Sequence, residues 1–246
     1  MALGESGYPP PDTGDAPHVA AVALPLPGLL RLLQLASPAL PIGAFAYSQG
    51  LEAAVEQRFI HDEATATDFL GGVLADGVAR LELPYLLRLY RAFSAGDAVL
   101  AERWSAELFA SRETAERRLE DQHLGRSLAR LLVDQGVPEA EAWCRSDVVT
   151  HAALFALAGA RFGVPEDALV TGFAFSWLES QVSALTRLGQ LGQLAAQRVL
   201  SAVAALIPNA VALAEGLPDA ELGATLPGLA LASAWHETQY SRLFRS

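Results

Sequence analysis

The sequence predicts an all-α fold, a single domain of roughly eight to ten packed helices behind a disordered N-terminal tail. Three observations support this prediction. Apolar residues recur at three- and four-residue spacing in one segment after another. No segment keeps the apolar–polar alternation that is typical of a half-buried strand. Proline and glycine separate the helical segments at short intervals, as expected for helices with short connections.

The composition bounds the class of protein. The 246 residues are 52% hydrophobic and 18% charged, which is enough apolar surface for a large core. A formal net charge of −11 argues against nucleic acid as a ligand, because phosphate binding needs clustered cations. All 17 basic residues are arginine, so a lysine nucleophile and a phosphate-binding lysine are excluded. The single cysteine, Cys144, excludes a disulfide within the chain and favours a reducing compartment.

Residues 1–27 are rich in proline, glycine, alanine and aspartate, and we expect them to form a disordered tail. Acidic residues stand where a signal peptide would need a basic and then an apolar segment. The most apolar later stretch, Val199 to Ala214, is interrupted by Pro208 and is shorter than the ~20 residues that cross a bilayer. We therefore expect a soluble, cytoplasmic protein with no membrane partner.

The first helix is expected to start at Pro27 and to end before Pro38, because proline disfavours helical geometry in the residue before it. A non-helical elbow follows, and Ser48 is the expected N-cap of a helix that resumes at Leu51. The elbow is either a well-packed helix–helix corner or a surface on which a partner docks, with Tyr47 as an amphipathic anchor. Its candidate partner-binding residues are Phe45, Tyr47, Ser48 and Gln49.

Helical segments with recognisable starts continue through the middle of the chain. Asp62 or Thr65 is expected to start a helix that runs to Val78. Pro84 is expected to open or bend the next helix, and Asp97 to cap the one after it.

The segment from Ser111 to Gln135 is the most charged part of the chain. Its run Glu120-Asp121-Gln122-His123 contains oxygen and nitrogen ligands of the kind that bind metals. Neighbouring residues on a helix point in different directions, however, so we interpret this run as a solvated helix face.

The second half of the chain is expected to hold three further helical stretches. Asp147 is the expected cap of a helix over His151–Phe162. The pattern over Pro165–Leu206 is nearly continuous, but Gly189 predicts a turn or a close backbone approach within it. A last short helix from about Ala230 leads into the C-terminal segment 236–246.

A search for catalytic or metal-binding motifs finds none with the required spacing. No two of the five histidines are three or four residues apart, and phosphate-loop, nucleophile-elbow and dinucleotide-binding motifs are absent. The sequence therefore predicts no catalytic residue, metal ligand or cofactor, and a protein that is not an enzyme. The alternative is an all-α metal-dependent hydrolase that uses His123, His151 or His236, although the apolar neighbours of His151 are typical of a buried, satisfied histidine.

The C-terminal segment 236–246 gathers tyrosine, phenylalanine and arginine, and tyrosine and arginine are enriched in binding hot spots. Two interpretations are open. Its apolar side chains either fold back onto the protein's own core, or the segment becomes ordered when a partner binds. The candidate partner-binding residues are His236, Glu237, Tyr240, Ser241, Arg242, Leu243, Phe244 and Arg245.

Four blocks along the chain together resemble a known family. They are the elbow LLQLASPALPIGAFAYSQGLE, the charged block from Ser111 to Leu128, a glutamine-rich block from Ser176 to Arg198, and the tail HETQYSRLFRS. Any one block is a weak signal, but four in the right order are a strong one. From about Leu29 onward the chain is similar to the UreF family of urease accessory proteins.

The resemblance implies a helical domain over residues 28–235, a homodimer, and a non-enzymatic scaffold for urease maturation. In that family the protein bridges a UreD/UreH-type accessory protein and the nickel-carrying GTPase UreG, and the assembly delivers nickel to apo-urease. By analogy, Tyr47 and Arg242 belong to the surface that recruits the GTPase, and residues 236–246 become ordered on the UreD-type protein. A further possibility is that Arg242 or Arg245 regulates GTP hydrolysis as a stabilising cation.

Gln193 and Gln197 lie one helical turn apart within the glutamine-rich block. They either line a polar path for the ion or form a buried hydrogen-bond pair between helices.

Overall fold

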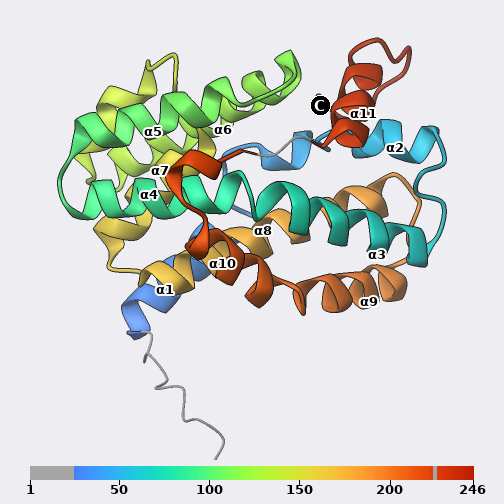
Figure 1. The fold of residues 1–246 in the computed structure, drawn as a ribbon, viewed down its shortest axis with the longest axis horizontal. Helices are drawn as coiled ribbons and strands as arrows, with labels where there is room; N and C mark the ends of the chain where they lie inside the picture. The colour runs from blue at the N-terminus through green and yellow to red at the C-terminus, as the bar shows by residue number, and fades with distance from the viewer. Residues whose placement is uncertain (1–24, 224–225) are drawn as a thin grey trace, which may run out of the picture.

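The computed structural model describes residues 25–223 and 226–246, and these residues form eleven α-helices and no strand (Figure 1). The all-α prediction is confirmed, with one helix more than the expected range. Most of the predicted disordered tail lies outside the described residues, but Leu26 and Pro27 already belong to the first helix. The helices are α1 (Leu26–Leu35), α2 (Leu51–Glu56), α3 (Glu63–Gly72), α4 (Glu82–Ser94), α5 (Ala98–Ala110), α6 (Ala115–Asp134), α7 (His151–Phe162), α8 (Glu166–Arg187), α9 (Gln193–Ala204), α10 (Ile207–Gly216) and α11 (Pro227–Glu237).

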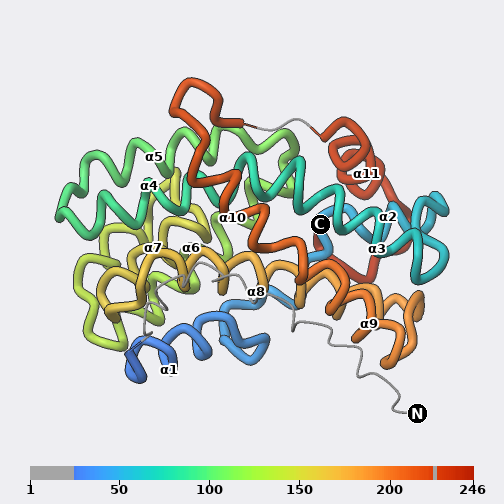
Figure 2. Tube along the Cα trace, turned by 60° about the horizontal axis from the view of Figure 1, so that its bottom comes forward, coloured from blue at the N-terminus to red at the C-terminus, as the bar shows by residue number. Residues whose placement is uncertain are grey.

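Helix α4 lies at the centre of the bundle, where it packs against α5, α7 and α8. Helix α7 is a core helix, because every residue from Ala152 to Gly159 is buried. Helices α5, α6 and α7 form one end of the molecule, and α2, α3, α9 and α11 form the other (Figure 1). Helix α1 lies along α8, on the side away from α11 (Figure 2).

Local signals set several helix boundaries as predicted. Asp62 and Thr65 form a capping box at the start of α3, and Asp97 caps α5. Gly189, with a φ of 72°, makes the expected turn between α8 and α9. The helix predicted to reach Val78 instead changes after Gly72 into a π-helix over Val73–Val78.

Two predicted caps are wrong. The hydroxyl of Thr150, rather than the carboxylate of Asp147, accepts the hydrogen bond at the start of α7. Helix α2 follows Gly50 rather than Ser48, and Gly50 has a left-handed φ of 82°. In both places the residue directly before the helix takes the cap position, although the hydroxyl of Ser48 still accepts the main-chain N–H of Glu52 in the first turn of α2 at 3.4 Å.

Among the described residues, one helical stretch, Gln193–Gly216, is long and apolar enough to cross a membrane by length and composition alone. It is divided into α9 and α10, and Pro208 stands in the first turn of α10. Helix α9 packs against α3 and α8, and α10 packs against α4 and α8. Packing within the bundle buries part of the apolar surface of this stretch, including Val199, Val203 and Ile207.

Helices α6 and α7 approach each other closely at Gly125. A Cβ atom at this position would lie 3.0 Å from the main-chain carbon and oxygen of Thr150 and 2.7 Å from a methyl group of Val149. The main chain of Thr150 cannot move away without shifting the start of α7. Gly125 therefore sets the distance between the two helices.

We expect Gly125→Ala to lower the free energy of unfolding by about 1–3 kcal/mol, the usual cost of overpacking a core. Gly72→Ala is the matched control, because no atom lies within 4 Å of a Cβ at that helical position. It should be neutral or stabilising by up to about 1 kcal/mol. Urea unfolding measures both variants, and equal stabilities would contradict the close approach.

Candidate partner-binding site

The elbow joins α1 to α2 and depends on two glycines. Gly43 and Gly50 have left-handed φ values of 83° and 82°, on either side of the short 3₁₀ helix Ala44–Ala46. A Cβ on Gly50 would lie 2.9 Å from the main-chain nitrogen of Ser233 in α11. Gly50 therefore serves both the turn and the contact with α11.

The elbow residues have different environments. Tyr47 and Ser48 are buried, whereas Phe45 is 69% exposed. The hydroxyl of Tyr47 lies 2.7 Å from Nδ1 of His123 in α6. Burial raises the pKa of Tyr47, and the nearby Arg245 guanidinium opposes this shift. The packed-corner interpretation is therefore confirmed for Tyr47 and Ser48, while Phe45 remains on the surface.

Gln49 connects the elbow to two helices. Its side-chain amide donates to a carboxylate oxygen of Glu120 at 2.7 Å and accepts from the indole N–H of Trp177 at 3.0 Å. Its φ of 58° places a residue other than glycine in the left-handed region, at a cost of roughly 1–2 kcal/mol. The two hydrogen bonds hold Gln49 in this conformation, against α6 and α8.

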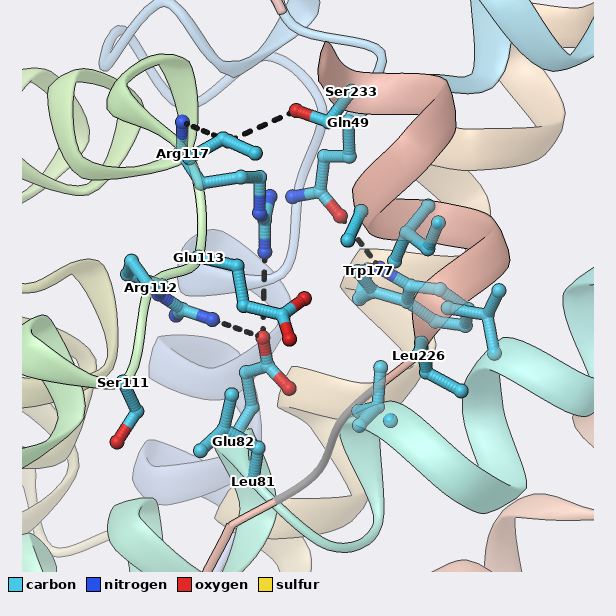
Figure 3. A pocket seen from close by; sticks show the side chains of 16 residues that line it. Gln49, Leu81, Glu82, Ser111, Arg112, Glu113, Arg117, Trp177, Leu226 and Ser233 are labelled. Atoms are coloured by element: carbon cyan, nitrogen blue, oxygen red, sulfur yellow. Dashed lines mark hydrogen bonds and ion pairs between the residues drawn. The ribbon is translucent and has the colours of Figure 1, made fainter.

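Helix α6 turns two carboxylates into the protein, so our interpretation of the run 120–123 as a solvated face is wrong for Glu120 and Asp121. Nε of Arg112 lies 2.5 Å from Asp121, and the same guanidinium reaches Glu82 at 2.5 Å (Figure 3). Burial opposes the charge of Arg112, but the adjacent Asp121 and Glu82 carboxylates outweigh it and raise the pKa of the guanidinium.

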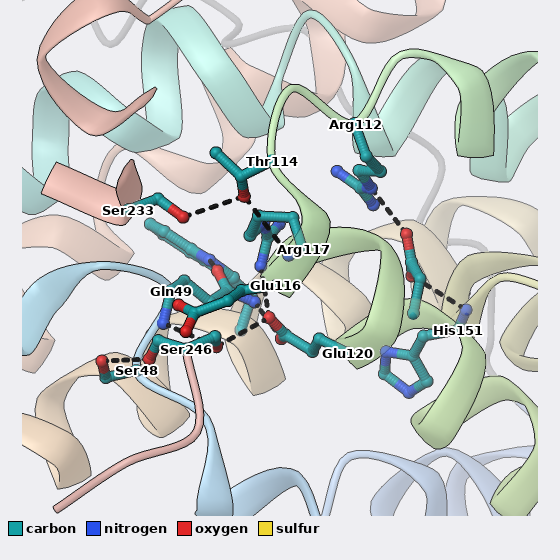
Figure 4. Close-up of polar contacts among 12 residues, drawn as sticks. Ser48, Gln49, Arg112, Thr114, Glu116, Arg117, Glu120, His151, Ser233 and Ser246 are labelled. Carbon is teal, nitrogen blue, oxygen red and sulfur yellow. Dashed lines mark hydrogen bonds and ion pairs between the residues drawn. The ribbon is translucent and has the colours of Figure 1, made fainter. Parts of the chain in front are cut away.

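A second arginine extends this buried cluster toward the elbow and the chain end. Arg117 donates to Glu120 at 2.8 Å and to Glu82 at 3.3 Å. The hydroxyl of Ser246 donates to Glu120 at 3.2 Å (Figure 4). A small pocket borders the cluster, with Trp177 and Leu226 facing the two arginines (Figure 3).

The C-terminal segment is partly folded back onto the protein. His236 is fully buried in α11, which extends to Glu237, and Phe244 is only 4% exposed. Tyr240 is fully exposed and Leu243 is 54% exposed. The fold-back interpretation is therefore confirmed for Phe244 and wrong for Tyr240 and Leu243. The remaining exposed candidates are Glu237, Ser241, Arg242 and Arg245.

The elbow and the C-terminal segment meet around Arg187 of α8. Its guanidinium lies 5.9 Å from the ring centre of Phe45 and 4.6 Å from that of Phe244, and it donates to the main-chain oxygen of Phe45. Arg245 lies beside Tyr47, whereas Arg242 pairs with Glu116 at 2.8 Å. The arginine that the structure brings to Tyr47 is therefore Arg245, not Arg242.

The three histidines of the hydrolase alternative lie in different environments. His123 pairs with Tyr47, His236 lies between Glu52 and Glu116, and His151 is half-buried near Asp121. In the part of the chain that the structure describes, no group of three or more histidine, cysteine, aspartate and glutamate side chains is arranged to hold a metal ion.

Gln193 and Gln197 are both exposed on α9. The interpretation as a buried hydrogen-bond pair is therefore wrong.

Sequence reasoning did not single out Glu52, Glu82 or Arg112, which are all buried. Glu52 stands among Leu51, Ala53 and Ala54, and an acidic residue in such an apolar run was the available signal.

The fold and the site define an all-α protein whose buried charges hold its elbow and its C-terminal segment together. The family model described as UreF matches residues 60–204. A urease accessory protein UreF of Chromohalobacter salexigens is 49% identical over 220 residues, which cover 89% of this chain and 94% of that protein. The UreF protein of Teredinibacter turnerae is 49% identical over 89% of this chain and 98% of that protein. The UreF protein of Alkalilimnicola ehrlichii is 46% identical over 89% of this chain and 97% of that protein. The chain belongs to the UreF family of urease accessory proteins.

Arg112→Ala would leave Glu82 and Asp121 buried without their shared cation. We expect the free energy of unfolding to fall by about 3–5 kcal/mol, as for other broken buried ion pairs. Arg198→Ala is the control, because its ion pair with Glu63 is exposed and should contribute little to stability. Urea unfolding compares the two variants, and a similar loss in both would argue against the buried cluster as a source of stability.

The lowered pKa of His151 predicts that the protein loses stability in mild acid. Burial lowers its pKa from 6.5 to about 4, with Arg112 adding to the shift and Asp121 opposing it. The fold favours the neutral ring of His151. The contribution of this ring to the free energy of unfolding is therefore complete above pH 6.5 and falls as the pH drops toward 4. At pH 5 the loss is about 2 kcal/mol.

His151→Gln removes this titration while keeping a polar side chain. The unfolding free energy of the wild-type protein relative to this variant should therefore fall by about 2 kcal/mol between pH 7.5 and pH 5. An NMR titration of the His151 ring with a midpoint near 6.5 would contradict the assignment.

Proposed function

We propose that this protein is a non-enzymatic, cytoplasmic scaffold in urease maturation, which acts as a homodimer and bridges a UreD/UreH-type accessory protein and the nickel-carrying GTPase UreG. In this role the assembly delivers nickel to apo-urease, and the chain itself catalyses no reaction. Family membership supports the accessory role. The observation that carries the bridging role is the surface formed jointly by the elbow and the C-terminal segment.

This surface combines exposed apolar side chains with arginine. Phe45, Tyr240 and Leu243 are exposed, and Arg242 and Arg245 stand beside them in the sequence or the fold. Large aromatic side chains and arginine supply most of the binding energy in protein interfaces. The buried part of the segment fixes the backbone at Leu243 and Arg245, which lowers the conformational entropy that a partner must remove on binding.

The two ends of this surface suit different partners. The apolar side chains of Tyr240 and Leu243 fit an apolar groove on the UreD-type protein. Phe45 stands two residues before Tyr47 in the elbow, and Arg245 lies beside Tyr47. We assign this end of the surface, together with Arg242, to recruitment of the GTPase. Because Tyr47 is buried, it would act there by holding Arg245 and the elbow in place.

The exposed side chains allow a test that leaves the fold intact. Tyr240→Ala and Leu243→Ala should each weaken binding of a co-expressed UreD-type protein by about tenfold or more, because each removes a large side chain from the interface. Leu194→Ala is the matched control, since Leu194 is 78% exposed on α9, a helix that packs against α3 and α8. Size-exclusion chromatography with light scattering measures the complex.

Deletion of residues 236–246 is a less specific test, because it also removes the buried side chains of His236 and Phe244. Wild-type affinity in both Tyr240→Ala and Leu243→Ala would overturn this placement of the interface. Failure of the full-length protein to bind the UreD-type protein would overturn the bridging role itself.

A further inference from the structure

The side chain of Glu52 is the point at which the C-terminal segment attaches to the rest of the protein. Glu52 is the second residue of α2 and is only 8% exposed. One carboxylate oxygen accepts the main-chain N–H of Leu243 at 2.8 Å, and the other accepts that of Phe244 at 2.9 Å. Nε2 of His236 lies 3.3 Å from the second oxygen. All three groups come from the last eleven residues of the sequence.

Two consecutive N–H groups on one carboxylate fix the direction of the main chain between them. Leu243 then points outward and Phe244 points into the protein, where it is 4% exposed. Arg245 N–H donates to the main-chain oxygen of Ala46 at 2.8 Å, and Ser48 N–H donates to that of Ser246 at 2.8 Å. The position of the carboxylate thus decides which side chains of the segment are presented to solvent.

The hydrogen bonds stabilise Glu52 as well as the C-terminal segment. Hydrogen bonds to an ionised acceptor are roughly twice as strong as those between neutral groups. A buried carboxylate without donors is costly, so the N–H groups of the segment also stabilise Glu52 in its position. His236 strengthens the arrangement, because its other ring nitrogen lies 2.8 Å from Glu116, which also accepts from Arg242.

We propose that Glu52 is the positioning residue of the C-terminal segment: it holds residues 243–246 against the elbow in the chain on its own, and thereby presents Tyr240 and Leu243 to the UreD-type protein. The first half of this statement concerns the isolated chain. The second half rests on the proposed scaffold function.

Amide hydrogen exchange on the purified full-length protein tests the first half without a partner. In the wild-type protein the amides of Leu243, Phe244 and Arg245 should exchange at least about tenfold more slowly than those of Tyr240 and Ser241, whose main-chain N–H groups have no acceptor among the described residues. Equal exchange across residues 240–245 in the wild-type protein would overturn the proposal, whatever the variants do.

Glu52→Gln keeps the shape of the side chain but replaces one acceptor oxygen with an NH₂ group that faces an N–H donor. It should raise the exchange rates of Leu243, Phe244 and Arg245 about tenfold or more. Glu56→Gln is the matched control, because it removes the same charge from the exposed end of the same helix. Unchanged exchange in α4 and α7 shows that Glu52→Gln is folded, and unchanged exchange in residues 243–245 would overturn the attachment.

Binding of the co-expressed UreD-type protein tests the second half. Binding that is about tenfold weaker in Glu52→Gln and unchanged in Glu56→Gln supports the positioning role. Wild-type binding by Glu52→Gln despite fast exchange in residues 243–245 would overturn that role and leave the attachment standing. If no version of the chain binds the partner while the exchange pattern is as expected, the scaffold function fails and the attachment is supported.

Discussion

The buried guanidinium of Arg112 is the contact on which the rest of the structure depends. Arg112 lies in the connection between α5 and α6, and its partners Glu82 and Asp121 come from α4 and α6. Asp121 also accepts the main-chain N–H of His151 at the start of α7. A buried charge is tolerated only with paired partners in good geometry, so one side chain fixes the relation of three helices.

The same cluster organises the surface at which we place partner binding. From Glu82 the contacts pass through Arg117 to Glu120, and from Glu120 to Gln49 in the elbow and Ser246 in the C-terminal segment. The exposed side chains of this surface are therefore attached to a rigid, charged centre. A site supported in this way keeps its geometry before a partner arrives, which favours binding.

The sequence was sufficient for features that depend on neighbouring residues. It predicted the helical class, the caps Asp62 and Asp97, and the turn at Gly189, because each of these arises within a few residues. The additional helix is α10, which the sequence pattern did not predict, because Pro208 interrupts the apolar stretch, although proline also fits the first turn of a new helix.

The buried charges could not be predicted in the same way. Asp121 looks like part of a solvated face because its partner Arg112 lies outside α6, and Glu120 does so because Gln49 and Ser246 donate to it from the elbow and the C-terminal segment. The other carboxylate partner of Arg112, Glu82, is 30 residues from it in the sequence. The burial of Tyr47 and Phe244 could not be predicted for the same reason. The elbow and the C-terminal segment are about 200 residues apart in the sequence, and the hydrogen-bonded residues Ser48 and Ser246 are separated by 198. Only the three-dimensional fold brings these groups together.

The burial of Ser246 has a consequence for the order of folding. During synthesis the helical core emerges before the residues that complete its polar centre, and domains begin to fold from the N-terminal side. Until residues 243–246 arrive, Glu52 lacks two of its donors and Glu120 lacks one. Residues 243–246 are thus added to a core whose helices have already been made.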